Sequence, residues 1–433
     1  TGGVVGSPIQ SPATRKMKDA HWLRAFERYR STDSDPHDFL KGGVHQLSQE
    51  LEARAAEDPV RFAGLALRMP DDVHPYYFDA LLRGVGASEL EPPIEATRAL
   101  LLRCHALPGR PCGRWIAQPL RRHRDAPLPL DLVEILTWYA TRDPDPPAVS
   151  NDFSGDISDA QRIEMQGLNS VRGSIAYELA DHIRRHEANV APLDRALQSL
   201  SRDRSAAVRG MAIRTLTGLM RHREQLAVKL FAELAAHPDD LILAGRAAHE
   251  FLRFAAGRQF PTIRPVLDRM LRSGNPEVRT CGAVHASLAA FENPEAGDLA
   301  APYVDADSAC RVGATRVAAA NIYKAPDRTR CETQLMGAFR DPDPDVREAA
   351  RGVFRKLADH NFENGERLVD GFIASPGCDA DGAAGLLAAL SRADASPAAM
   401  SLRACNAYLD ARAATGGDAG RGMAIHDAGE VAL

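Results

Sequence analysis

The stretch that decides the fold runs from Asp341 to Ala350 and reads Asp-Pro-Asp-Pro-Asp-Val-Arg-Glu-Ala-Ala. Asp343 carries a side-chain acceptor of the kind that caps the first turn of a helix, and Pro344 fits the first helical position, where no amide hydrogen is needed. The acidic residue after the proline, Asp345, is favourable at the positive end of the helix dipole. The stretch therefore predicts that a helix begins at Pro344.

The same stretch contains one copy of an internal repeat. Each copy has a small or apolar residue and then an arginine after a short turn, and successive arginines are 37, 37, 33, 32 and 36 residues apart. The copies are Val171-Arg172, Val208-Arg209, Gly245-Arg246, Val278-Arg279, Cys310-Arg311 and Val346-Arg347. A period of this length is typical of architectures in which each unit stacks on its neighbours.

The residues around each copy have the periodicity of helices. One apolar series follows the turn Asn275-Pro276-Glu277, and another precedes it and ends at Gly274, which suits a helix C-terminus. These series are Val278, Cys281, Val284, Leu288 and Phe291, and Ile263, Val266, Leu267, Met270 and Leu271. A hairpin of about 35 residues cannot cover its own apolar face, so neighbouring hairpins must stack. The sequence therefore predicts an all-α fold, a right-handed α-solenoid of helix-turn-helix repeats.

The Asp/Asn-Pro-x-Val-Arg pattern that opens the second helix of each hairpin resembles HEAT repeats, most clearly at residues 341–350. The resemblance is good over residues 167–357 and weaker over two later helical patterns, at 375–390 and 396–409. Helical patterns also precede it at residues 22–29, 43–56, 60–67, 76–84, 94–104 and 130–139. We therefore expect residues 1–140 to be the N-terminal helical part of the solenoid and residues 165–433 to be a HEAT-like array.

Residues 141–164 interrupt these patterns. The segment begins Arg142-Asp143-Pro144-Asp145-Pro146-Pro147, and its prolines exclude regular helix at the start. A long irregular stretch is unusual inside a compact array and is more often functional than inert. We predict an irregular Pro/Asp-rich loop at residues 141–164 that divides two sub-arrays.

A second resemblance extends from Gly42 to about Arg403. The order of several short segments resembles the C-terminal HEAT-like region of large bacterial STAND-type ATPases that carry a NACHT-like nucleotide-binding module, many of which act in antiviral defence. The segments are residues 42–47, 58–63, 69–72, 113–116, 138–140 with 143–146, and 167–173. No G-x-x-x-x-G-K-[ST] motif occurs in the sequence, so any ATPase activity belongs to a part of the parent protein outside this chain.

Composition and charge restrict the function classes. The 433 residues are 45% hydrophobic and 26% charged, which is typical of a folded globular protein, and the formal net charge of −5 disfavours non-specific binding to nucleic acid. Seven scattered cysteines without a C-x-x-C pair predict reduced residues in a cytosol. No apolar run is long enough to span a membrane, and the start at Thr1 without a leader suggests a piece of a longer protein.

Two His-Glu pairs, His186-Glu187 and His249-Glu250, resemble the motifs that hold two irons in deoxyhypusine hydroxylase, a HEAT-repeat enzyme. Such a centre needs ligands that converge from several helices, and Arg184 and Arg185 would repel a cation beside the first pair. We interpret the pairs as exposed or capping helix residues. A His-Glu metal hydroxylase stays as an enzymatic alternative.

The densest basic run is Arg121-Arg122-His123-Arg124, between Pro119 and Pro127. HEAT-like DNA glycosylases hold DNA on a basic face, but no aromatic residues alternate with these arginines to stack on bases. We predict a solvated loop, with a contact to a phosphate or an acidic partner as the alternative. DNA processing is accordingly the other enzymatic alternative.

Three further groups have a structural and a functional interpretation. Cys104-His105 and Cys112 suggest a thiol site, but the turn at residues 108–111 between them favours buried structural cysteines. The repeated arginines are expected to pair with turn aspartates of the adjacent repeat, and the alternative is a ladder that binds an acidic ligand. Trp115 and Trp138-Tyr139 are expected in the core or between repeats, and the alternative is an exposed binding hot spot.

The sequence therefore predicts a non-enzymatic scaffold for protein recognition, with no catalytic, cofactor-binding or metal-binding residues. The resemblance to STAND-type ATPases implies a bacterial, cytoplasmic sensor region. Its implied partners are a protein, with phage proteins among the candidates, and the ATPase module of the same polypeptide. Neither a membrane nor nucleic acid is an expected partner.

Overall fold

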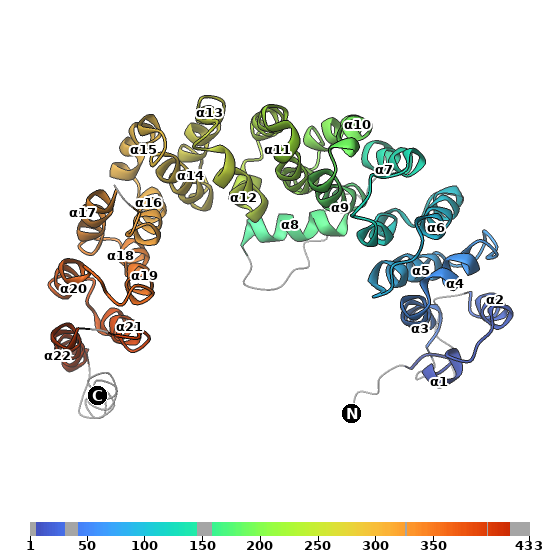
Figure 1. The fold of residues 1–433 in the computed structure, drawn as a ribbon, viewed down its shortest axis with the longest axis horizontal. Helices are drawn as coiled ribbons and strands as arrows, with labels where there is room; N and C mark the ends of the chain where they lie inside the picture. Colours follow the sequence, from blue (N-terminus) through green and yellow to red (C-terminus); the bar gives the residue numbers. More distant parts are fainter. Residues whose placement is uncertain (1–5, 31–41, 145–157, 325–326, 396, 416–433) are drawn as a thin grey trace. The chain divides into compact units, whose positions relative to one another are not determined.

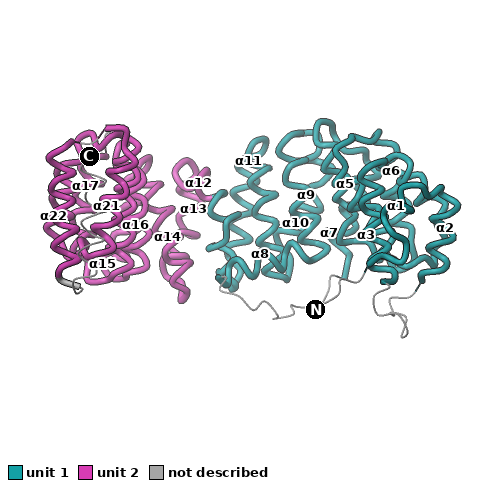
Figure 2. The backbone as a smooth tube through the Cα atoms, turned by 90° about the horizontal axis from the view of Figure 1, so that it is seen from below, with its two compact units in different colours: residues 1–251 teal, residues 252–433 magenta. Residues whose placement is uncertain are grey.

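The computed structural model describes residues 6–30, 42–144, 158–324, 327–395 and 397–415. These residues form α-helices, short 3-10 helices (η) and connecting turns, and the described ranges contain no β-strand. The chain divides into two compact units, residues 1–251 and residues 252–433 (Figure 2). The fold is an α-solenoid of HEAT-like helical hairpins, as the repeat pattern predicted (Figure 1).

The first unit stacks its helices in two rows. One row contains α3, α5, η1 with η2, α9 and α11, and the other contains α4, α6, α7 and α10, with contacts between successive members (Figure 1). The elements are α1 (Ser11–Thr14), α2 (Asp19–Arg28), α3 (Val44–Glu57), α4 (Pro59–Ala66), α5 (Pro75–Ala87), α6 (Ile94–Ala106), η1 (Gly113–Trp115), η2 (Gln118–Arg122), α7 (Leu130–Arg142), α8 (Asp159–Asn169), α9 (Val171–Arg185), η3 (Glu187–Asn189), α10 (Val190–Ser201), α11 (Ala206–Ala235) and η4 (Leu241–Ala244). The six predicted N-terminal helices are confirmed by α2 to α7.

The second unit has the same construction. Contacts join α14 to α16, α16 to α18 and α19, and these to α21, while a second row contains α13, α15, α17, α20 and α22 (Figure 1). The unit begins inside α12 (Arg246–Ala255), and its other helices are α13 (Phe260–Leu271), α14 (Pro276–Ala289), α15 (Pro294–Ala306), α16 (Ser308–Ala320), α17 (Arg328–Ala338), α18 (Pro344–Arg351), α19 (Val353–Ala358), α20 (Glu366–Ile373), α21 (Ala380–Leu390) and α22 (Ala398–Thr415).

Two of these helices begin at the capping residues that the sequence predicted. The Asn275 side chain accepts hydrogen bonds from the amides of Glu277 (2.8 Å) and Val278 (3.3 Å), with Pro276 at the first position of α14. Asp343 accepts from the amide of Asp345 at the start of α18 (2.9 Å). Each cap satisfies amides that have no partner inside the helix.

The repeated arginines join adjacent repeats, which confirms their structural interpretation. Arg172 donates from Nε and a terminal nitrogen to the two carboxylate oxygens of Asp203 (2.7 and 3.2 Å), and both side chains are buried. The same type of pair recurs in four other places: Arg209–Asp239 (2.9 Å), Arg279–Asp307 (3.1 Å), Arg311–Asp341 (2.7 Å) and Arg351–Asp379 (2.6 Å). In each pair the aspartate belongs to the turn of the next repeat. The alternative, a ladder open to an acidic ligand, is wrong at these positions because carboxylates of the chain already occupy the guanidinium groups.

Two copies of the repeat depart from this rule. Arg246 binds Glu250 of its own helix at 3.0 Å and is exposed. Arg347 donates to the carbonyl oxygens of Asp341 (2.7 Å) and Pro342 (3.0 Å), while Arg351, one turn later, pairs with the next aspartate.

Only the two ends of the segment predicted as a loop at residues 141–164 are described, and each end contains helix. Helix α7 continues to Arg142, and α8 begins at Asp159, because the Ser158 hydroxyl accepts from the Gln161 amide (3.3 Å) and the Gln161 side chain accepts from the Ser158 amide (3.1 Å). This reciprocal cap starts a helix inside the segment expected to be irregular. Residues 145–157 lie outside the described residues. Helix α7 contacts α9 and α10 across the segment, and the division into units lies at residues 251/252 instead.

The apolar stripe predicted on α14 is buried only in part. Val278 is fully buried, whereas Cys281, Leu288 and Phe291 are half-buried. The buried side of α14 combines Val278, Val284 and His285 with the small residues Gly282, Ala283, Ala286 and Ala289. The small residues lie where the stacked helices approach closely: a side chain at Gly313 of α16 would meet the Thr280 carbonyl and the Ala283 side chain. The small residues, and not the large ones, therefore mark the contact between successive helices, and Leu288 and Phe291 remain accessible at the surface.

Candidate functional site

The two His-Glu pairs do not converge on a metal site. His186 Nε2 contacts the Arg124 carbonyl oxygen (3.0 Å), Glu187 pairs with Arg223 (2.9 Å), and Glu250 pairs with Arg246. A search of the described residues finds no cluster of three or more His, Cys, Asp or Glu side chains that could hold a metal ion. The geometry of these pairs is that of surface helix residues.

The basic run at residues 121–124 is not a solvated loop, because η2 ends within it, Arg121 and Arg124 are bound to helix α9, and Arg122 donates to the Ala87 carbonyl oxygen at the end of α5 (3.3 Å). Arg121 forms a charge-assisted hydrogen bond from Nε to Glu178 (2.6 Å), and Arg124 pairs with Asp181 (3.0 Å). The Glu178 side chain is buried, and these arginines compensate its carboxylate. The fold also brings Tyr177 between Arg121 and Arg214, whose guanidinium carbons lie 5.9 and 4.4 Å from the ring centroid. Sequence reasoning missed this aromatic neighbour because it lies in another helix.

The cysteines and aromatic residues singled out in the sequence are packed. Cys104, Cys112 and Tyr139 are fully buried, and all seven cysteines are free thiols. Trp138 is half-buried beneath Arg110, whose guanidinium carbon is 3.9 Å from the ring centroid. Trp115 is half-buried beside Arg83 (5.3 Å). These residues belong to the stack and do not form an exposed hot spot.

A buried carboxyl group that the sequence did not single out lies beside Cys112. Burial raises the pKa of Asp79, on α5, to about 6, and the hydrogen bond with Cys112 and the charges of Arg83 and Arg114 oppose this rise only in part. Oxygen Oδ1 of Asp79 has no hydrogen-bond partner. Asp79 therefore titrates near neutral pH from inside the stack.

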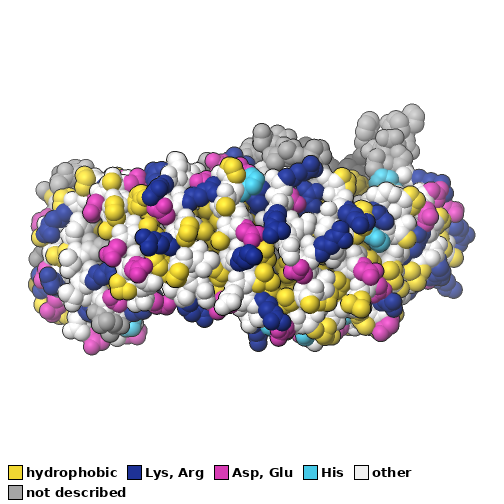
Figure 3. Space-filling view, turned by 90° about the horizontal axis from the view of Figure 1, so that it is seen from above, with side chains coloured by type: hydrophobic (Ala, Val, Ile, Leu, Met, Phe, Trp, Pro, Cys, Tyr) yellow, Lys and Arg dark blue, Asp and Glu magenta, His cyan; other side chains and the backbone are white. Residues whose placement is uncertain are grey.

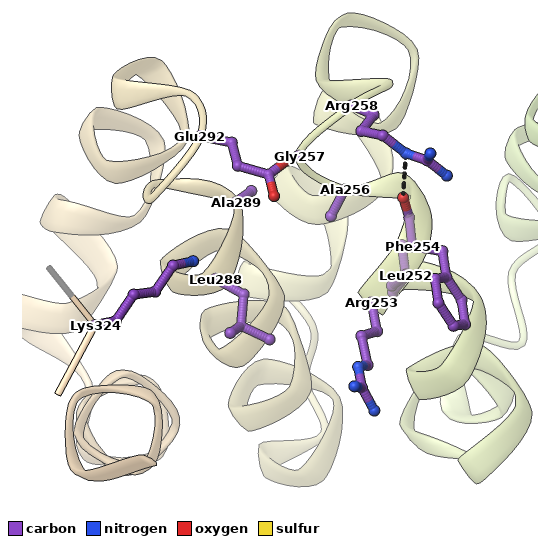
Figure 4. A pocket seen from close by; sticks show the side chains of 10 residues that line it. All are labelled: Leu252, Arg253, Phe254, Ala256, Gly257, Arg258, Leu288, Ala289, Glu292 and Lys324. Carbon is purple, nitrogen blue, oxygen red and sulfur yellow. Dashed lines mark hydrogen bonds between the residues drawn. The ribbon is translucent and has the colours of Figure 1, made fainter. Parts of the chain in front are cut away.

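One surface hollow with both apolar and charged lining residues lies in the second unit and is called here the α12–α14 hollow. It has a volume of about 340 Å³ (Figure 4). Its apolar part comes from the ends of α12 and α14, and its rim carries charged and aromatic side chains. The lining residues are Leu252, Arg253, Phe254, Ala256, Gly257, Arg258, Leu288, Ala289, Glu292 and Lys324.

Basic side chains approach the hollow from different elements. In Figure 4, Lys324, which follows α16, and Arg253, on α12, lie on opposite sides of Leu288, while Arg258 turns away from Glu292 and Lys324. Arg258 donates from Nε to the Phe254 carbonyl oxygen at 3.3 Å. The hollow thus has three cations and a single carboxylate around an apolar floor.

The Glu292 carboxylate lies at one end of the hollow, in the space left by the missing side chain of Gly257. Glu292 lies against Gly257 so closely that a Cβ atom at that position would overlap its carboxylate (Figure 4). Residue 257 must therefore be small for Glu292 to keep this position. The hollow thus has a carboxylate at one end and cations farther along.

The aromatic residues of the hollow separate it from an ordinary charged surface. The Phe254 side chain is 52% exposed, whereas Leu252, two positions earlier on α12, is fully buried. Lys324 Nζ lies 4.4 Å from the centroid of Phe291, at the edge of the hollow. Exposed apolar surface beside cations is a combination that peptide and protein ligands use.

Sequence reasoning missed this hollow. One signal was present in the sequence. Leu288 and Phe291 belong to the predicted apolar stripe of α14, but smaller residues make the close contact of α14 with its neighbours, so these two large side chains stay accessible. No local pattern predicts that Lys324 and Arg253 line the same hollow, because only the folded chain places both residues there.

The remaining surface does not present one extended charged face in the view of Figure 3, where acidic side chains lie among the basic ones. No helix in the described part of the chain is long and apolar enough to cross a lipid bilayer.

Comparisons with known proteins give similarity to solved structures only. No family model and no curated protein matches the chain. An engineered protein is 14% identical, with 96% of this chain and 99% of that chain covered and a TM-score of 0.38. The karyopherin Kap121p bound to RanGTP is 13% identical (TM-score 0.34; 97% of this chain, 37% of Kap121p), and UNC-45 from Drosophila melanogaster is 10% identical (TM-score 0.32; 97% and 67%). The chain thus spans 37% of the Kap121p chain.

Proposed function

We propose that the chain is a non-enzymatic protein-recognition solenoid. The observation that supports this proposal is the α12–α14 hollow, which combines an exposed Phe254 with accessible cations over an apolar floor. Aromatic and arginine side chains contribute a large share of the binding energy in protein interfaces, and a rigid helical stack holds them in place without a cost in ordering.

We further propose that this solenoid is the sensor region of a larger bacterial, cytoplasmic STAND-type ATPase. The support is the order of segments between Gly42 and Arg403 that resembles such proteins, together with a stack that offers a binding surface. A sensor acts only when its partner binds the active state of the ATPase better than the resting state. The solenoid would supply that difference in affinity.

The recognition role is tested by capturing proteins from phage-infected and uninfected bacterial cells with the purified chain. A captured protein is then purified, and its dissociation constant is measured by calorimetry with wild type and with Phe254→Ala. We expect Phe254→Ala to weaken binding at least tenfold. Truncation of an aromatic side chain at a hot spot removes about 2 kcal/mol or more of binding free energy. Failure of every captured protein to bind directly would refute the proposal.

A matched control is Leu402→Ala, which removes another exposed apolar side chain, 60% accessible, from α22 of the same unit. It should leave the dissociation constant unchanged.

The sensor role needs a different test, in the parent ATPase. Removal of residues 1–433 should leave nucleotide binding intact and abolish activation by the partner, and activation that persists without them would contradict the role.

The enzymatic alternatives have a direct test as well. Elemental analysis of the purified chain should find no stoichiometric iron or zinc. About two irons per chain, lost in His186→Ala and His249→Ala, would replace the scaffold with a metal-dependent hydroxylase.

A further inference from the structure

We propose that the surface of α9 and α11 beneath α8 is a helix-binding site, and that an amphipathic helix of a partner protein replaces α8 there. The inference rests on the proposed recognition function and adds a docking surface in the first unit and the kind of segment that it takes. It follows from the position of α8, the shape of the surface beneath it and the few side chains that hold it.

Helix α8 belongs to neither of the two rows of the first unit. It contacts α9, α11 and η4, and it lies across α9 and α11 on the side away from α10 (Figure 1). Helices α9 and α11 also contact each other directly: Thr215 donates to the Ala176 carbonyl oxygen (2.6 Å), and a side chain at Gly218 would overlap the Ala180 carbonyl. Departure of α8 therefore uncovers this surface without opening the stack.

The surface beneath α8 has the shape to receive a helix. Gly167 makes a close approach to α11, since a Cβ atom there would lie 2.6 Å from the Ala207 carbonyl oxygen and 2.6 Å from Met211 Cγ. Ala160, seven positions earlier on α8, is buried as well. Residues seven apart share one face of a helix, so α8 lies on α11 through small side chains. The site therefore selects a helix with a small residue where it crosses α11.

Helix α8 does not fill this site completely. A hollow of about 20 Å³ remains where α8, α11, η4 and α12 meet, and its lining includes Ala160 and Ile163 of α8, Met211 and Ile242. A larger apolar side chain in place of Ala160 would occupy this space and gain contacts that α8 lacks. The expected partner segment is thus an amphipathic helix with Leu or Met seven positions before its small residue, which docks by its apolar face.

Few side chains hold α8 in place. Of its 11 residues only Ala160 and Gly167 are buried, whereas nine of the 15 residues of α9 are buried. Met165 is 38% exposed, and the ion pair between Arg162 and Asp159 (2.9 Å) lies within α8 itself. Burial of little apolar surface contributes little free energy. A partner helix therefore needs only a modest advantage in affinity to take this place.

The turn between α8 and α9 allows α8 to move while α9 stays. Ser170 is the single residue between the two helices, its backbone is extended, and its hydroxyl accepts from the Gly173 amide (3.1 Å). This cap satisfies an amide of α9 and does not require α8 to be seated. The Asn169 side chain accepts a hydrogen bond from Arg114 of η1, so we expect α8 to pivot about this end.

The probe is a fluorescein-labelled peptide of residues 158–170, the α8 sequence itself, added to the full chain. In Gly167→Glu the chain's own α8 cannot seat, because the new side chain overlaps the Ala207 carbonyl. Fluorescence anisotropy should show that the peptide binds this variant about tenfold or more tighter than the wild type, where α8 competes. A peptide with Ala160→Leu should bind about tenfold tighter again, because it fills the hollow.

Met165→Glu is the matched control, because it places the same acidic side chain on the exposed side of the same helix. It should keep α8 seated and bind the peptide no better than the wild type does. A peptide with Gly167→Glu should not bind the Gly167→Glu chain. Circular dichroism and melting temperature should show that both variant chains stay folded, since the direct contact of α9 with α11 is unchanged.

Amide hydrogen exchange of the wild type tests the replacement without any variant of the chain. Amides of α8 should exchange about tenfold or more faster than those of α9 and α11, because local opening follows the small burial of α8. An excess of the Ala160→Leu peptide should raise exchange in α8 further and leave α9 and α11 protected.

Three results would overturn the inference: a folded Gly167→Glu chain that does not bind the peptide, exchange in α8 as slow as in α9, or peptide binding that leaves exchange in α8 unchanged. The recognition function has a separate readout. A captured partner protein should bind Gly167→Glu more tightly than the wild type, and equal binding would show that it docks elsewhere although the chain recognises proteins. If no protein is captured, the recognition function fails, and the peptide still decides whether α9 and α11 form a helix-binding site.

Discussion

Arginine side chains at the joints between repeats are held in ion pairs with aspartates of the next turn. In Arg172–Asp203 both side chains are buried, so removal of the arginine leaves an uncompensated carboxylate. We expect Arg172→Ala to lower the free energy of unfolding by about 3–5 kcal/mol in urea denaturation followed by circular dichroism.

Arg246→Ala is the control for this prediction. Arg246 occupies the same place in the repeat but is 81% exposed and pairs only with Glu250. Its removal should change stability by no more than about 0.5 kcal/mol. Equal losses of unfolding free energy in the two variants would show that the arginine stabilises its own helix and not the contact between repeats.

Asp79 gives a pH dependence of unusual sign. Because burial raises its pKa to about 6 in the folded chain, against about 4 when unfolded, the folded state holds an extra proton between these values. Stability from this group is fully present below about pH 4 and is lost as the pH rises through 6. Asp79→Asn cannot ionise and should be more stable than the wild type by about 2–3 kcal/mol at pH 7, with the difference vanishing near pH 4. Urea denaturation at several pH values measures it.

Asp307 should behave in the opposite way. Burial raises its pKa, but hydrogen bonds from Arg279 and from the Cys310 amide outweigh burial and hold the pKa below its ordinary value. Its stabilisation is present above the unfolded pKa and is lost as the pH falls through the folded pKa. Asp307→Asn should therefore reduce the loss of stability in acid and leave the change between pH 5 and 7 as in the wild type.

At the scale of helices, the close contacts depend on glycine. A methyl group at Gly313 of α16 would meet the Thr280 carbonyl of α14, which cannot move without the helix. Gly313→Ala should therefore cost about 1–3 kcal/mol although alanine is the better helix former. Gly385→Ala in α21, where no atom lies within 4 Å, should instead stabilise the chain by about 0.5–1 kcal/mol. Thermal unfolding of both variants tests the pair, and shifts of the same sign would contradict the packing described.

Helix starts were predictable from the sequence because their causes are local, whereas the arginine–aspartate joints followed from the repeat period. Asn275 and Asp343 cap their helices by hydrogen bonds over two or three residues, and the patterns at 43–56 and 94–104 match α3 and α6 closely. The start of α8 was missed although Ser158 and Gln161 form a recognisable capping box, because the prolines before it dominated the interpretation.

The candidate site was not predictable in the same way. Leu288 looked like a core residue, because helical periodicity does not tell whether a helix contacts its neighbour through large or small side chains. Lys324 and Arg253 are far apart in the sequence, and only the folded chain places both on the rim of one hollow. A hollow of this kind exists only once the repeats are assembled.

At the scale of the whole molecule, stacking should make stability local. In the second unit Phe372 is fully buried and its ring centroid lies 4.7 Å from that of Phe354 and 5.2 Å from that of Phe339. Phe372→Ala leaves a cavity that should cost about 3–5 kcal/mol. Because each repeat of a solenoid contacts mainly its neighbours, the loss should not spread along the chain.

Amide hydrogen exchange can resolve where this loss is felt. We expect faster exchange in α17, α19 and α20, which surround the cavity, and unchanged exchange in α9 and α11, which pack within the first unit. A partner bound to the α12–α14 hollow would then slow amide exchange in the nearby helices and leave exchange in the first unit unchanged. Any signal to another domain would have to pass through helices that contact one another in series. Uniform acceleration in both units after Phe372→Ala would instead require one cooperative core, and the nearest-neighbour description of this solenoid would be wrong.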